Sequence, residues 1–196
     1  WKGFAVSIGV SILLLVLIMY GIIPGIVRVT SAFELFFVNS LGLPFNSGMD
    51  IHPLLFIVAL MLSLWYSFTH SDRLRIFILA GITLLLSGVW LLTGSLVLNI
   101  VFLAVIVYGL WLLSTKQKVA LNTILTSLMV IVIGYSSFAV IVVRSSANPP
   151  INENNPSNPF ALLYYLNREQ YGRRPLFHGA YYNAPVTDYV KGKPTY

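Results

Sequence analysis

Five apolar segments that contain no Asp, Glu, Lys or Arg take up most of residues 4–143. A bilayer hydrocarbon core about 30 Å thick is crossed by a helix of about 17–25 apolar residues, which is close to the length of each segment. A helix of a soluble protein would show a continuous polar stripe, and these segments show none. The sequence therefore predicts an integral membrane protein with spans at Phe4–Ile23, Pro53–Phe68, Ile76–Leu92, Leu96–Leu113 and Leu121–Val143.

The composition supports this class and excludes others. The chain is 57% hydrophobic and only 9% charged, whereas soluble domains carry about 25% charged residues. Its net charge of +6 is spread over loops and the tail, so the charge indicates membrane topology rather than nucleic-acid binding. The chain has no cysteine, and its histidines, His52, His70 and His178, show no ligand spacing. No metal site is therefore predicted.

The distribution of basic residues predicts the orientation. Five spans place the N-terminus and the second and fourth loops on one face, and this face carries Lys2, Arg73, Arg75, Lys116 and Lys118. The other face carries only Arg28 and Arg144 near span ends. Cytoplasmic loops are richer in Lys and Arg. We therefore expect a multi-pass protein of the bacterial inner membrane, with a cytoplasmic N-terminus and with the first loop (24–52) and the tail (144–196) in the periplasm.

The first external loop contains a helix signal of its own. Gly21–Gly25 is expected to interrupt the first helix, and Ser31 and Glu34 then fit a capping box, in which each side chain bonds the other residue's amide. A helix over Ala32–Leu41, closed by Gly42, follows from this pattern. Ten residues make about 15 Å of helix, which is too short to span, so an interfacial or re-entrant helix is predicted.

The chain changes character at residue 144. Turn-forming residues fill the stretch up to Asn158, which, with Pro159 at the first helical position, opens a helix that Gly172 closes. A short strand and a turn are expected within 175–185. The aromatic content is too high for a disordered tail. The predicted fold is an all-α membrane bundle (1–143) of about five spans plus the interfacial helix, followed by the start of a periplasmic α/β or α+β domain (144–196).

Motifs in both halves of the chain resemble a known family. In the tail they are Arg144–Pro150, Glu153–Pro156, Asn158–Leu163, Tyr165–Gly172, Arg174–Leu176 and Tyr181–Pro185. In the membrane half they are Tyr20–Gly25, Phe33–Gly48, Leu121–Leu125 and Ile133–Phe138. They resemble the family called domain of unknown function 2723, which is typical of Bacteroidetes-type bacteria and is grouped with protein O-mannosyltransferase-like enzymes of the GT-C superfamily.

The resemblance implies a glycosyltransferase. Enzymes of this superfamily take a sugar from a polyprenyl-phosphate donor at the outer face of the membrane, so the expected partners are membrane lipid, that donor with a mannose-like sugar, and a secreted protein as acceptor. No further cofactor is expected in this segment. The acidic Asp-Cys-Gly-Glu-like motif near the family's N-terminus has no equivalent here. The chain is therefore expected to be an internal fragment whose catalytic residues lie upstream of Trp1, and no catalytic residue is carried over.

Candidate binding residues each have a structural alternative. Arg28 and Arg144 lie just outside spans one and five, where a guanidinium could bind donor phosphate or simply anchor the helix among headgroups. Glu34 could line the acceptor or sugar region, or cap its own helix. The polar residues Asn148, Asn152, Glu153, Asn154 and Asn155 suit sugar hydroxyls, and the asparagines equally suit turns. The alternative function is a non-catalytic membrane scaffold or transport subunit.

Overall fold

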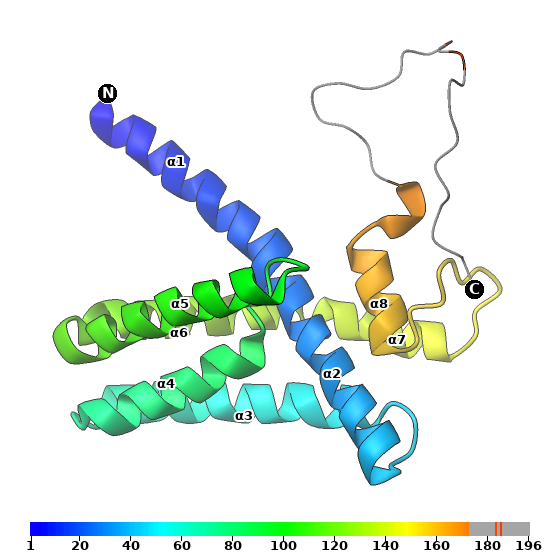
Figure 1. Cartoon of the computed structure of the whole chain (residues 1–196), viewed down its shortest axis with the longest axis horizontal. Coiled ribbons are helices and arrows are strands. Elements are labelled where there is room, and N and C mark those ends of the chain that lie inside the picture. The colour runs from blue at the N-terminus through cyan, green and yellow to red at the C-terminus, as the bar shows by residue number, and fades with distance from the viewer. Residues whose placement is uncertain (173–182, 184, 186–196) are drawn as a thin grey trace.

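The computed structural model describes residues 1–172, 183 and 185, and all regular structure in this part of the chain is helical (Figure 1). The α-helices are α1 (Lys2–Val16), α2 (Ile23–Leu41), α3 (Ser47–Thr69), α4 (Arg73–Ser87), α5 (Leu96–Lys116), α6 (Lys118–Tyr135), α7 (Ser137–Ser146) and α8 (Pro159–Leu166). A π-helical turn, η1 (Leu17–Ile22), joins α1 to α2, and a 3₁₀ turn, η2 (Glu169–Tyr171), follows α8.

Four helical stretches in this part of the chain are long and apolar enough to cross a membrane. They are Lys2–Leu41, Ser47–Thr69, Leu96–Lys116 and Lys118–Ser146. The chain is therefore a multi-pass membrane protein that is all-α over residues 1–172. The prediction of an α-helical membrane bundle is confirmed, with four long spans in place of the five expected.

The first span is longer than predicted because the helix does not break at Gly21–Gly25. Pro24 has no N–H to donate to the carbonyl four residues earlier, and the wider π turn η1 accommodates this loss without ending the helix. The continuous stretch from Lys2 to Leu41 has 40 residues, or about 60 Å of helix. The separate interfacial helix predicted at Ala32–Leu41 is thus the end of α2. Its predicted end is confirmed, because Gly42 follows Leu41 with a left-handed φ of 66°.

The third predicted span, Ile76–Leu92, is shortened. Helix α4 has 15 residues and ends at Ser87, which gives about 22 Å of helix. The next residue, Gly88, has a φ of +64° and lies against Gly25 of α2. A Cβ atom on Gly88 would lie 2.2 Å from the carbonyl oxygen of Gly25. This backbone contact between α2 and α4 explains why the helix stops where the apolar sequence continues.

The core lies among α3, α4, α5 and α6. Its buried members are Phe56, Leu60, Ile76, Ala80, Leu110, Leu121 and Leu125. Helices α3 and α4 run side by side, and α5 and α6 form a second pair next to them (Figure 1). Helix α1 projects away from this bundle and has no buried residue (Figure 1).

The connections gather at two ends of the bundle. Lys118 Nζ donates to the carbonyl of His70 at 2.6 Å, which joins the α3–α4 and α5–α6 connections. Asn46 Nδ2 donates to the carbonyl of Ser157 at 3.5 Å, which joins the α2–α3 connection to the tail. The predicted grouping of loops on two faces agrees with these contacts.

The last predicted span and the predicted tail helix each consist of two helical segments in the structure. Leu121–Val143 falls on α6 and α7, which meet at Ser136. In the tail, Asn158 Oδ1 accepts from the Ala161 amide at 2.9 Å, which confirms the predicted N-cap. Helix α8 ends at Leu166 and η2 occupies the turn before Gly172. The expected strand and turn at 175–185 lie outside the described residues, apart from Asn183 and Pro185.

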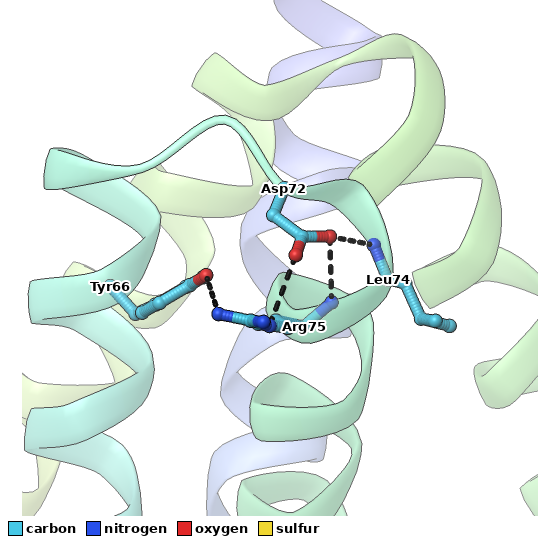
Figure 2. A network of polar contacts seen from close by, with 4 residues as sticks. All are labelled: Tyr66, Asp72, Leu74 and Arg75. Carbon is cyan, nitrogen blue, oxygen red and sulfur yellow. Dashed lines mark hydrogen bonds and ion pairs between the residues drawn. The ribbon is translucent and has the colours of Figure 1, made fainter.

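Asp72 begins α4 as its N-cap residue. Figure 2 shows its carboxylate accepting from the Leu74 amide at 3.2 Å and the Arg75 amide at 3.4 Å. Its second oxygen lies 3.1 Å from Arg75 Nε, and Arg75 also donates to the Tyr66 hydroxyl of α3 at 3.5 Å. The cap and this contact fix the start of α4 against the end of α3.

The Asp72 cap makes a testable contribution to stability. Asp72→Ala should lower the free energy of unfolding by about 1 kcal/mol, because two amides at the helix start lose their acceptor. Asp72→Asn keeps that acceptor and loses only an exposed ion pair, so it should cost less than about 0.5 kcal/mol. Equilibrium unfolding in mixed detergent micelles measures both changes. Equal losses in the two variants would show that the ion pair, not the cap, stabilises α4.

Candidate functional site

Glu34 links α2 to the start of α3. Its side chain is 1% exposed, and its carboxylate accepts from the Asn46 amide at 2.6 Å and the Gly48 amide at 2.7 Å. The predicted capping box is wrong, because α2 is already helical at Ser31 and the Ser31 hydroxyl donates to the Val27 carbonyl at 2.9 Å. Glu34 therefore caps the helix that follows it, where a negative charge is favoured by the helix dipole.

Two side chains of neighbouring helices bond carbonyls in the last turn of α4 and in the connection that follows it. His52 of α3 is fully buried, and its Nε2 donates to the Leu86 carbonyl at 3.0 Å, while its Nδ1 lies 2.8 Å from the Thr30 hydroxyl. Arg28 of α2 donates to the Leu91 carbonyl. The last carbonyls of a helix lack partners within it, and His52 bonds one of these, whereas Leu91 lies beyond the end of α4 at Ser87. Arg28, predicted to bind donor phosphate, is thus engaged in a bond within the bundle.

The asparagine cluster forms a folded turn. The buried Ser145 hydroxyl lies 3.0 Å from Oδ1 of both Asn152 and Asn155, and Asn152 Nδ2 donates to the Ser145 carbonyl at 3.1 Å. Asn154 Nδ2 donates to Gln170 Oε1 at 2.5 Å. Asn148, Asn154 and Asn155 all have positive φ, which Asn tolerates better than most residues. These observations favour the turn interpretation of the cluster.

Arg144 and Glu153 are the two candidate residues whose charged side chains are not engaged within the described part of the protein. Arg144 lies in the last turn of α7, and Glu153 lies in the loop that follows. Both side chains are exposed. Neither forms a hydrogen bond or an ion pair with the part of the chain that the structure describes. Of the two predicted phosphate-binding residues, Arg144 is the one whose guanidinium faces outward.

A groove of about 560 Å³ runs between α2, α3, α6, α7 and α8. Most of its wall is apolar and comes from the spans, as at Ile26, Phe56, Val132 and Val142. Its polar residues include Asn46, Asp50 and Ser157, which surround the start of α3 and the tail. Among the lining residues that the structure describes there is no Lys, Arg or His. A groove with these walls can hold the hydrocarbon part of an amphiphile.

The predicted site residues do not line this groove. Arg28, Glu34, Arg144, Asn148, Asn152, Glu153, Asn154 and Asn155 are all absent from its wall, and their proposed roles stay predictions. Sequence reasoning missed Asn46 and Asp50. The signal available for them was local, namely an Asn before a helix and an Asp in its first turn, a pattern that many helices share.

Comparisons with known proteins add no assignment. No family model, curated protein or solved structure matches the chain. Within residues 1–172, no three His, Asp or Glu side chains lie close enough together to hold a metal ion. The chain is a multi-pass helical membrane protein, and any activity assigned to it rests on the arguments that follow.

Proposed function

We propose that the chain is the membrane segment of a GT-C-like glycosyltransferase, similar to the protein O-mannosyltransferases. It would transfer a mannose-like sugar from a polyprenyl-phosphate donor to a secreted protein at the outer face of the bacterial inner membrane. In this proposal the N-terminus lies in the cytoplasm and the tail lies in the periplasm, which requires that the shorter helix α4, packed beside α3, is a fifth crossing in addition to the four long spans. The motif resemblance to the family called domain of unknown function 2723 supports the reaction class.

The position of Arg144 is the observation that carries the proposal. The candidate span Lys118–Ser146 ends in the turn that contains Arg144, and the polar loop of the tail begins directly after it. The phosphate of a membrane-anchored donor lies at this boundary between hydrocarbon and water. A guanidinium binds phosphate oxygens with two parallel hydrogen bonds and keeps its charge. Arg28 is less suited, because it already donates to the Leu91 carbonyl.

Arg144→Lys tests this role. The substitution keeps the positive charge and removes the forked donor geometry, so kcat/KM for the polyprenyl-phosphate donor should fall about tenfold. The measurement is transfer of a labelled sugar in membranes that contain the full-length protein, at subsaturating donor, with the amount of folded protein quantified alongside.

The matched control is Arg73→Lys. Arg73 is exposed at the first position of α4, and its replacement should leave sugar transfer unchanged. If Arg144 only anchors α7 among headgroups, a lysine there would serve as well, since either side chain can reach the interface. Wild-type transfer by the Arg144→Lys protein would therefore remove Arg144 from the donor site.

One observation favours the alternative of a non-catalytic scaffold or transport subunit. The side chains of Glu34, Asn152 and Asn155, which were candidates for binding sugar, are all engaged in hydrogen bonds within the protein. A scaffold or transport subunit does not require polar side chains that are free to bind sugar hydroxyls, so these internal hydrogen bonds fit that role. Folded full-length protein that transfers no sugar from any polyprenyl-phosphate donor, and that co-purifies with another membrane protein, would support this alternative.

A further inference from the structure

The groove between α2, α3, α6, α7 and α8 has a mostly apolar wall and, at the start of α3, a polar end that contains Asn46, Asp50 and Ser157. Helix α3 supplies both parts, because Phe56 and Ile57 lie along the groove while Asn46 and Asp50 lie at the start of the helix. The tail covers this end through Ser157 and Pro159. The apolar part is formed by helices that lie within the bilayer, where a lipid chain can enter from the side.

The polar end presents hydrogen-bond acceptors that lack donors. Asn46 Oδ1 is buried and has no hydrogen-bond partner among the described residues. Asp50, one turn into α3, is exposed and forms no ion pair in this part of the chain. Behind them, the Glu34 carboxylate is occupied by the Asn46 and Gly48 amides. A buried acceptor without a donor is destabilising until a ligand or water supplies one.

The negative charge at the polar end of the groove favours a ligand with a positively charged headgroup. Among the residues of 1–172 that line the groove, Asp50 is the only charged one, and Glu34 adds a second carboxylate that contacts Asn46. A ligand that brought only an anionic group would meet two negative charges and no cation from the described part of the wall. A positively charged group with N–H donors would satisfy both Asn46 Oδ1 and Asp50. The apolar wall requires that this group be attached to a hydrocarbon chain.

We propose that the groove binds a phospholipid whose headgroup carries a primary ammonium, with one acyl chain along the apolar wall. The ammonium donates to Asn46 Oδ1 and to the Asp50 carboxylate. This site is separate from the donor-phosphate role of Arg144, which lies outside the groove wall, so either proposal can fail without the other.

Lipid retention by the purified chain tests the site. The protein is incubated in detergent with dioleoyl phosphatidylethanolamine, dioleoyl phosphatidylglycerol or dioleoyl glucosyl-diacylglycerol, and bound lipid is quantified by native mass spectrometry. We expect at least tenfold tighter binding of phosphatidylethanolamine than of the other two lipids. Equal binding of the anionic or the glucosyl lipid would overturn the assignment of an ammonium headgroup.

Two variants locate the headgroup. Asp50→Asn should remove the preference for phosphatidylethanolamine. Asn46→Gly should weaken its binding while keeping the left-handed backbone at φ 75°. The matched control is Glu153→Gln, which removes an exposed charge outside the groove. This variant should bind each of the three lipids as the wild type does. A preference that survives in a folded Asp50→Asn protein, as judged by its unfolding temperature, would overturn the proposal.

A second pair of variants locates the acyl chain. Ala139 of α7 is exposed and lines the groove, so Ala139→Trp should fill it and reduce retention of phosphatidylethanolamine at least tenfold. Ala104 of α5 is also exposed but lies outside the wall, so Ala104→Trp should have no effect. Equal retention by the two tryptophan variants would show that the lipid binds elsewhere.

Discussion

Replacing Gly88 by alanine should lower the free energy of unfolding by about 3 kcal/mol or more. A Cβ atom there would lie 2.2 Å from the Gly25 carbonyl oxygen and 2.8 Å from Val29 Cγ2. The backbone atoms of α2 cannot give way as a flexible side chain could, so the two helices must move apart. The φ of +64° adds backbone strain for any residue with a Cβ. This separation would also displace Leu91 from Arg28.

Gly134→Ala in α6 is the matched control for this experiment. A Cβ atom at Gly134 would meet no atom within 4 Å, and alanine is the better helix former by about 1 kcal/mol. The control should therefore be neutral or stabilising. Equilibrium unfolding in mixed micelles measures both variants. A Gly88→Ala protein as stable as the wild type would mean that α2 and α4 do not touch through their backbones.

Replacing Glu34 by alanine should destabilise the protein by about 3 kcal/mol, because the buried amides of Asn46 and Gly48 would both lose their acceptor. Glu34→Gln keeps a single carbonyl acceptor and should fall between alanine and the wild type. In Glu34→Ala, the loss of stability should appear first as faster amide hydrogen exchange at the start of α3, because the unpaired amides lie there.

Glu153→Ala is the control for Glu34→Ala. Glu153 is exposed and bonds to nothing in the described chain, so its removal should change the free energy of unfolding by less than about 0.5 kcal/mol. Hydrogen exchange by mass spectrometry and equilibrium unfolding should be measured together. Protection at the start of α3 that is unchanged in Glu34→Ala would show that this carboxylate does not cap α3.

Local sequence signals predicted those features that depend on neighbouring residues. The start of α8 at Asn158 and Pro159 and the end of α2 at Gly42 were predicted correctly, because each depends on residues within one helical turn. The apolar segments likewise identified the membrane class. These features require no knowledge of which helices are neighbours in space.

Features that depend on distant residues were not predictable in this way. Ser31 and Glu34 fit a capping box by spacing, yet Glu34 bonds amides 12 and 14 residues away. The apolar run at Ile76–Leu92 does not reveal that Gly88 meets Gly25 and ends α4 at Ser87. The groove was missed for the same reason, because five helices between Ile22 and Leu166 contribute to it.

The isolation of α1 has a consequence for how variation in this chain is interpreted. No residue of Lys2–Val16 is buried against the described part of the chain. The side chains of α1 therefore contribute little to the free energy by which the bundle folds. Insertion of a single helix into the bilayer is a separate step from the association of helices. Substitutions in α1 should therefore leave the measured free energy of unfolding nearly unchanged. Selection can act on this segment only through membrane insertion or assembly.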